Sequence, residues 1–182
     1  FWTNVNPNPP IIQGSSYDGA NYAIRNLTGG VGAVNSTIAP TDEIVVGQGF
    51  IIKKTNVGNA NIIFNNSMRT SSKGTFFNAR TASTDNKIWL KLTTPAKNFN
   101  TLLIGYVKGA TDGLDRGYDA EPITQSSDMF YSVIDNKNLV IQGRNNSFTN
   151  NDIVTLGATF FEKGNCEISI SQVEGIFNGS QA

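Results

Sequence analysis

The chain of 182 residues contains no histidine and a single cysteine, Cys166. Without histidine there is no Ser-His-Asp triad, no Cys-His pair and no imidazole base, and one cysteine can neither close an internal disulfide nor build a Cys/His zinc site. Fourteen basic and fourteen acidic residues cancel without clustering, so the basic stripe of a nucleic-acid-binding protein is missing. No apolar run approaches the ~20 residues of a membrane-spanning helix. The composition favours a noncatalytic binding or structural module that contacts no nucleic acid and does not span a membrane.

The N-terminal part carries two weak structural signals. Residues 4–16 are rich in proline, which predicts an irregular N-terminal segment. Between residues 17 and 27, Ala20, Ile24 and Leu27 follow helical spacing, which predicts one or two helical turns. A Gly-Gly pair soon afterwards keeps that helix short.

From Glu43 onward the apolar residues alternate with a period of two. The runs Glu43–Lys53 and Ala60–Phe64 predict a strand pair joined through residues 56–59. A strand at Lys87–Thr93 would place three apolar side chains on one face and Trp89 on the other. The next strand, Thr101–Val107, is apolar on both faces, which predicts that both faces are covered.

The C-terminal half continues the strand pattern. A hairpin is predicted where Asp135–Asn138 separates two strand-like runs. The strands predicted here are Met129–Ile134, Leu139–Gln142, Ile153–Leu156, Ala158–Phe161 and Glu167–Val173, the last with Ile168 and Ile170 inward. Nine or ten strands with at most one short helix predict an all-β domain over residues 1–182. We expect an antiparallel two-sheet β-sandwich, similar to a jelly roll.

One loop holds four of the fourteen acidic residues. Residues 111–121 carry four carboxylates, two glycines and Arg116. The acids are Asp112, Asp115, Asp119 and Glu121. Calcium prefers such oxygen ligands on a turning loop, although the spacing is not that of an EF-hand. The alternative is a turn in which the Asp side chains accept hydrogen bonds from backbone amides and Arg116 pairs with one of the acids.

Two aromatic residues are candidates for glycan binding. Trp89 faces away from its apolar strand neighbours, and Tyr118 lies in the acidic loop. An exposed aromatic ring can stack on a sugar, but a large aromatic residue is normally well buried. The alternative for Trp89 is therefore a ring covered by a loop or helix. Cys166 is interpreted as a small buried apolar residue.

Seven segments in a fixed order carry a resemblance that covers nearly the whole chain. They are Gly47-Gln48-Gly49-Phe50-Ile51-Ile52-Lys53, Phe64-Asn65-Asn66-Ser67-Met68-Arg69, Lys87-Ile88-Trp89-Leu90, Leu103-Ile104-Gly105-Tyr106, Asp115-Arg116-Gly117-Tyr118-Asp119, Leu139-Val140-Ile141-Gln142-Gly143-Arg144 and Val154-Thr155-Leu156-Gly157. Together they resemble a domain of large surface and adhesin-like proteins that the bacterial type IX secretion system exports. That domain commonly lies upstream of the C-terminal sorting domain.

The resemblance implies a location on the bacterial outer cell surface and no catalysis, and it supplies no set of functional residues. It also implies that the chain is a fragment of a larger surface protein, whose remainder or attachment machinery would be the partner. The leading hypothesis is a noncatalytic structural or adhesive domain. One alternative is a carbohydrate-binding module in which calcium stabilises the acidic loop. Another is a secretion cargo or assembly subunit that is bound through an open sheet edge.

Overall fold

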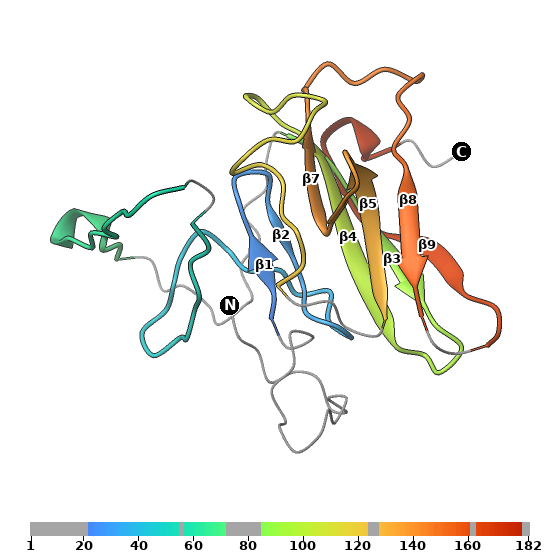
Figure 1. Cartoon of the computed structure of the whole chain (residues 1–182), viewed down its shortest axis with the longest axis horizontal. Coiled ribbons are helices and arrows are strands. Elements are labelled where there is room, and N and C mark those ends of the chain that lie inside the picture. Colours follow the sequence, from blue (N-terminus) through green and yellow to red (C-terminus); the bar gives the residue numbers. More distant parts are fainter. Residues whose placement is uncertain (1–21, 55–56, 72–84, 124–127, 161–162, 180–182) are drawn as a thin grey trace.

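The computed structural model describes residues 22–54, 57–71, 85–123, 128–160 and 163–179 (Figure 1). The irregular segment predicted for residues 4–16 lies outside this part of the chain. The strands are β1 (Ile24–Arg25), β2 (Gly30–Val31), β3 (Asn86–Thr93), β4 (Phe99–Tyr106), β5 (Met129–Ile134), β6 (Lys137–Leu139), β7 (Ile141–Arg144), β8 (Leu156–Thr159) and β9 (Glu167–Glu174). Two 3-10 turns, η2 (Asn66–Met68) and η3 (Gly175–Phe177), are the helical elements of the described residues.

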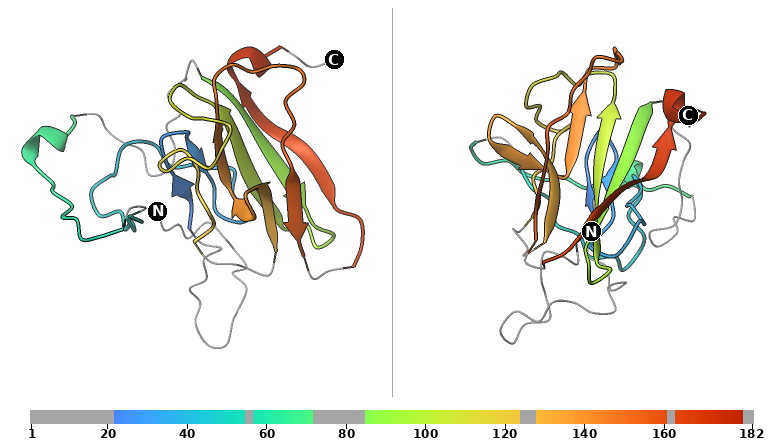
Figure 2. Two further views of the ribbon diagram at one scale, coloured as in Figure 1. Left: turned by 45° about the horizontal axis from the view of Figure 1, so that its top comes forward. Right: turned by 90° about the vertical axis from the view of Figure 1, so that its right-hand side faces the viewer.

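The described strands form three sheets, which confirms the all-β prediction and corrects its details. The sheets have the orders β7-β4-β3-β9, β6-β5-β8 and β1-β2. The expected sandwich had two sheets and antiparallel strands only, whereas β4 and β7 run parallel. Figure 2 gives two further views of this arrangement.

The central strands β3 and β4 follow the predicted alternation. Their antiparallel register pairs Leu90 with Leu102 and Trp89 with Leu103. Leu102 belongs to a core that includes Phe130 of β5, so the two larger sheets pack face to face there. Leu103 belongs to a second core on the opposite face. Both faces of β4 are therefore covered, as its sequence predicts.

A small hairpin covers that opposite face, and it replaces the helix expected before residue 27. The Asn26 side chain accepts a hydrogen bond from the Thr28 amide at 2.9 Å, and the Asn26 amide donates to the Gly29 carbonyl at 2.9 Å. Gly29 has a φ of 148°, a value that favours glycine. This turn chemistry reverses the chain and pairs Ile24 with Val31. Over residues 22–27 the helix prediction was wrong because the turn overrides the helical spacing, and residues 17–21 lie outside the described part of the chain.

The predicted hairpin between β5 and β6 is confirmed, with a tighter turn. Asp135 and Asn136 have φ values of 48° and 60°, as a two-residue type I′ turn requires. The chain then leaves this sheet at Val140 and continues as β7 in the four-stranded sheet. The single strand predicted for Leu139–Gln142 is thus two short strands in different sheets.

The region after β7 also needs a correction. Two strands were predicted, at Ile153–Leu156 and Ala158–Phe161, but the structure has the single strand β8 between residues 156 and 159. Gly157 of β8 pairs with Tyr131 of β5. A Cβ at residue 157 would run into the Tyr131 ring, so glycine permits this close pairing.

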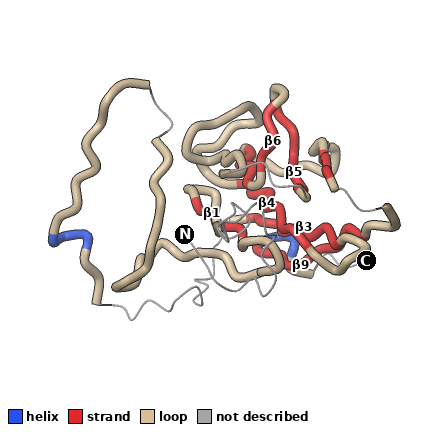
Figure 3. Tube along the Cα trace, turned by 60° about the horizontal axis from the view of Figure 1, so that its bottom comes forward, coloured by secondary structure: helices blue, strands red, loops and turns tan. Residues whose placement is uncertain are grey.

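Residues 41–54 and 57–71, here called the arm, project from the rest of the molecule (Figures 1 and 3). The strand pair predicted at Glu43–Lys53 and Ala60–Phe64 was wrong, because the described residues of the arm contain no strand. The two runs still face each other in antiparallel fashion. The Phe50 and Phe64 ring centroids are 6.2 Å apart, and the Thr70 hydroxyl donates to the Glu43 carboxylate at 3.4 Å. The arm has no further strand beside these two runs among the described residues, and an isolated two-stranded ribbon is only marginally stable in water.

Candidate functional site

The acidic loop covers the outer edge of β7. The Ala120 amide donates to the Ile141 carbonyl at 2.9 Å, and the Val140 amide donates to the Ala120 carbonyl at 2.8 Å. Further along β7, the Gly143 amide donates to Asp119 Oδ1 at 2.8 Å. The backbone of the loop and the Asp119 carboxylate therefore form the hydrogen bonds that a neighbouring strand would otherwise form with the backbone of β7.

Asp119 is a partly buried acid of this loop. Its second oxygen, Oδ2, accepts a hydrogen bond from the Asp115 amide at 2.5 Å, while the Asp115 carboxylate accepts one from the Thr111 amide. Burial raises the pKa of the Asp119 carboxyl above its ordinary value, and the negative charge of Asp115 adds to that rise. The two backbone hydrogen bonds on Asp119 oppose it. The prediction that Asp side chains accept hydrogen bonds from backbone amides is confirmed.

The other two acids of the loop lie apart and face basic side chains. The Asp112 carboxylate lies 3.4 Å from the Arg144 guanidinium. Glu121 pairs with Lys137 at 3.2 Å and with Lys53 at 3.8 Å. Across the described ranges, no three acidic or other metal-ligating side chains are grouped so that they could hold an ion. The calcium hypothesis has no preformed site in this part of the chain and stays a prediction.

Tyr118 joins the acidic loop to the hairpin β1–β2. Its carbonyl oxygen accepts hydrogen bonds from the Asn26 amide group and the Thr28 hydroxyl, both at 2.7 Å. Its side chain packs on glycines, since a Cβ at Gly143 would lie 2.7 Å from Tyr118 Cβ and one at Gly109 would meet the phenol oxygen. The structure thus gives Tyr118 a structural role, and glycan stacking on this half-buried ring stays a prediction.

Trp89 lies under the hairpin. Its side chain is 8% exposed and packs in the core that contains Val31 and Leu103. The indole Nε1 donates to the Gly30 carbonyl at 2.9 Å. The prediction that Trp89 is covered is confirmed, although the cover is a β-hairpin rather than a loop or helix. Stacking on a sugar requires an exposed ring, which this conformation does not offer.

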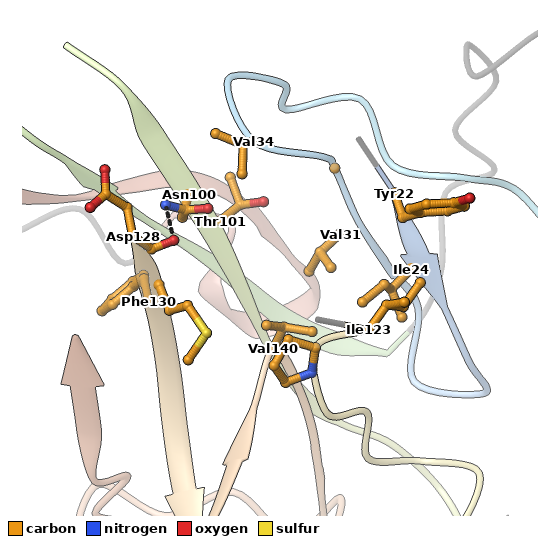
Figure 4. Close-up of a pocket in the computed structure, with 13 residues that line it drawn as sticks. Tyr22, Ile24, Val31, Val34, Asn100, Thr101, Ile123, Asp128, Phe130 and Val140 are labelled. Carbon is orange, nitrogen blue, oxygen red and sulfur yellow. Dashed lines mark hydrogen bonds between the residues drawn. The ribbon is translucent and has the colours of Figure 1, made fainter. Parts of the chain in front are cut away.

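A small cavity lies beside the hairpin, between it and the two larger sheets (Figure 4). It measures about 60 Å³ and is lined by apolar residues such as Ile24, Val31 and Val140. Asn100 at its rim donates to the Asp128 carbonyl at 3.3 Å. An engineered apolar cavity of roughly 150 Å³ takes up benzene, so a cavity of about 60 Å³ is too small for a sugar ring.

One surface, here called the open side, consists of the strands β8 and β9 and the exposed apolar side chains of Leu156, Phe160, Ile168 and Ile170. Both are edge strands, and no strand of the described residues pairs with their outer edges. Ile168 and Ile170 pair with Leu92 and Leu90, so they share the inner face of the sheet. They are nevertheless 56% and 57% exposed. Leu156 and Phe160, in and next to β8, are exposed as well.

Ile168 and Ile170 point to the inner face of the sheet, as predicted. The prediction was wrong in implying that they are buried. The three-stranded sheet packs on β4 through Phe130, and neither Ile168 nor Ile170 belongs to the core that forms there. The alternating sequence of β9 is the same as that of a covered strand, so no local signal reveals the exposure. Cys166, just before β9, packs against the core as predicted for a small apolar residue, but it is only partly buried.

The fold and this surface define an all-β domain with one covered and one open sheet edge. The chain belongs to the family described as Domain of unknown function (DUF8693), whose model matches residues 1–182. No curated protein and no solved structure shows significant similarity to it. None of the helices in the described ranges is long and apolar enough to cross a membrane.

Proposed function

We propose that the chain is a noncatalytic structural or adhesive domain of a bacterial surface protein that the type IX system exports. Its partner would be the remainder of that protein or the attachment machinery outside the cell. The observation that supports the proposal best is the open side, where Ile168 and Ile170 are exposed on an edge strand. Exposed apolar side chains that lie together mark contact surfaces.

The open side has the chemistry of strand addition. An edge strand offers backbone donors and acceptors to an extended segment, and alternate side chains select which segment fits. Proteins usually protect such an edge with charges, bulges or covering loops. β9 has one bulge, between Trp89 and Leu90 of the neighbouring strand, but the side chains of Ile168 and Ile170 that point inward are apolar. A surface of this kind suits stable contact with another polypeptide better than turnover of a small substrate.

The proposed location rests on the seven ordered segments that resemble type IX-exported surface proteins. An antibody against the domain should label intact cells of the source bacterium, and labelling should disappear when type IX export is abolished. Labelling that needs permeabilised cells would overturn the proposed location. This experiment does not depend on which surface of the domain makes contact.

The proposed contact surface is tested with matched variants. Ile170→Lys places a charge on the open side, whereas Leu114→Lys places the same charge on a 45% exposed apolar residue of the acidic loop. Binding of the purified domain to the rest of the parent protein, or to cells that lack the domain, should weaken at least about tenfold with Ile170→Lys. The Leu114→Lys variant should bind as the wild type does. Equal binding by all three proteins would remove the open side from the proposal.

A further inference from the structure

We infer that the open side of one copy takes up the arm of a second copy, with Phe50–Lys53 adding as an antiparallel strand to β9. The inference rests on the proposed role of the open side as a contact surface and names its occupant. Each chain has both the strand that is donated, Phe50–Lys53, and the strand that accepts it, β9. Two copies can therefore pair each arm with the β9 strand of the other copy.

The arm has the properties of a donor strand. Phe50, Ile51 and Ile52 are exposed apolar residues in a run with strand alternation, and Lys53 follows them. β-branched and aromatic residues favour extended backbone. In Figure 1, in the left view of Figure 2 and in Figure 3, the arm lies on the far side of the molecule from β9. The arm therefore does not cover the open side of its own chain in this conformation.

The acceptor strand limits where the donor can pair. The bulge in β9 falls after Ile170, because Leu90 pairs with Ile170 and Trp89 pairs with Gln172. Regular pairing is thus available along Glu167–Ile170. These four residues match the length of Phe50–Lys53.

Charge and apolar pattern select one register. In the antiparallel arrangement with Ile52 opposite Ile168, Phe50 is opposite Ile170. The same arrangement places Lys53 opposite Glu167, at the end of the acceptor strand. Directly opposed residues share a face of a sheet, so both apolar pairs would lie on the inner face and the ion pair on the outer face.

Other registers lose one of these matches. A parallel strand with Phe50 opposite Ile168 would place Lys53 opposite Ser171, with no acid as partner. An antiparallel strand moved by two residues would pair Lys53 with Ser169 instead. A shift by one residue would turn the apolar side chains to the outer face. The ion pair between Lys53 and Glu167 is therefore the feature that distinguishes the predicted register from the others.

Release of Phe50–Lys53 breaks the ring contact with Phe64 and an ion pair of Lys53, whereas the Arg25–Asp42 ion pair that ties the base of the arm to β1 stays in place. Lys53 lies 3.8 Å from Glu121, and the two side chains are 66% and 39% exposed. Exposed ion pairs of this kind contribute little to stability. Reciprocal exchange between two copies would close into a two-fold dimer, as is typical of soluble homo-oligomers.

The first test is a charge exchange across the predicted pair, measured by sedimentation of the full chain over a range of concentrations. Lys53→Glu and Glu167→Lys should each weaken dimerisation about tenfold, because each replaces attraction by repulsion at two symmetric contacts. The double variant K53E/E167K should recover the affinity of the wild type. A wild-type chain that stays monomeric at about 100 µM would overturn the inference. So would a double variant that is as weak as the single variants.

The second test is a cross-link between mixed copies. In a Cys166→Ser background, a chain with Ile52→Cys is mixed with a chain with Ile168→Cys under mild oxidation. The predicted register brings these two positions together, so a disulfide-linked pair should form readily. Ile52→Cys mixed with Leu114→Cys is the matched control and should remain largely uncoupled. Equal coupling in both mixtures would overturn the inference.

The outcomes separate this inference from the proposed function. A monomeric chain that binds a different partner through Ile170 would overturn the exchange of arms and support the contact surface. A dimer that Ile170→Lys disrupts, but that lacks the 52–168 cross-link, would also reject the arm as occupant. Cell-surface labelling tests the proposed location independently of either result.

Discussion

The two edges of the four-stranded sheet differ in how they are protected. At β7, the acidic loop binds the outer edge, and Ile141 is fully buried. At β9, the outer edge has no strand beside it among the described residues, and Ile170 is more than half exposed. One fold therefore contains a closed edge and an edge available for contact. Ile141 lies on the face that the hairpin β1–β2 covers, in the core with Trp89 and Leu103. What packs over a face, rather than the strand sequence, therefore decides whether its apolar residues are buried.

The closed edge also explains the cluster of acids. Asp119 accepts the Gly143 amide hydrogen bond that a strand carbonyl would otherwise accept, and it binds the Asp115 amide as well. A carboxylate with two acceptor oxygens can do both at once. The acids of the loop thus have a structural explanation that requires no metal ion.

The largest expected difference lies between apolar truncations at the two edges. Ile141→Ala should lower the free energy of unfolding by about 2–5 kcal/mol, because it leaves a cavity in a packed core. Ile170→Ala should lower it by less than about 1 kcal/mol, because more than half of this side chain is already in water. Urea denaturation at about 1 µM protein, where self-association is weak, measures both. Equal losses would show that β9 is covered in solution.

The second prediction concerns the hydrogen bonds of Asp119 at the β7 edge. Asp119→Ala removes the acceptor of two backbone amides and should cost about 1–3 kcal/mol in urea denaturation. Asp112→Ala is the matched control, because its side chain is 61% exposed and its contacts with Arg144 and with the Asn145 amide are both long, at 3.4 Å. We expect that control to cost less than about 1 kcal/mol. An equal cost for both variants would contradict the role of Asp119 at the β7 edge.

A smaller effect is expected from pH. The pKa of Asp119 is raised above its ordinary value of 3.8, mainly by burial. The folded state therefore binds the Asp119 proton more tightly than the unfolded state does. The resulting contribution to the free energy of unfolding is fully present below pH 3.8 and is lost as pH rises through the folded pKa. The stability of the wild type relative to Asp119→Asn should fall over this window, as urea denaturation from about pH 3.5 to about pH 7 would measure. A relative stability that rises with pH would contradict the assigned shift.

The smallest effect is expected from calcium. The carboxylates of Asp115 and Asp119 accept backbone hydrogen bonds, and that of Asp112 lies beside Arg144. We expect the melting temperature in millimolar calcium to differ from that in chelator by less than about 1 °C. A specific site near saturation would stabilise by about 2.7 kcal/mol and raise the melting temperature by several degrees. A shift of that size would support a calcium site in the acidic loop.

The sequence predicts the parts of the fold whose neighbours are local or fully buried. The alternation in β3 and β4 identifies both strands and their faces, and Asp135 and Asn136 identify the hairpin turn. The β1–β2 hairpin was missed because the Asn26 turn competes with a helical spacing of similar strength. Of the candidate site residues, Trp89 was correctly expected to be covered. The hydrogen bonds of Asp119 at the β7 edge could not be predicted, because they depend on a strand more than twenty residues away.

Exposure could not be predicted from the sequence. The runs at Glu43–Lys53 and Ala60–Phe64 have strand composition, but they lie in the arm without a sheet to join. Ile168 and Ile170 alternate as buried residues do, yet they stay exposed and outside the core between the two larger sheets. In both cases the deciding factor is how far another layer extends, which is a property of the assembled molecule.

The passage of the chain from one sheet to the other has a mechanical consequence. One residue, Val140, separates β6 from β7, whereas residues 160–166 separate β8 from β9. The step at Val140 therefore ties the two layers together at one end of the sheets. A segment that pairs with β9 would add contacts at the other edge of the four-stranded sheet, and we expect it to raise the force needed to pull the domain apart.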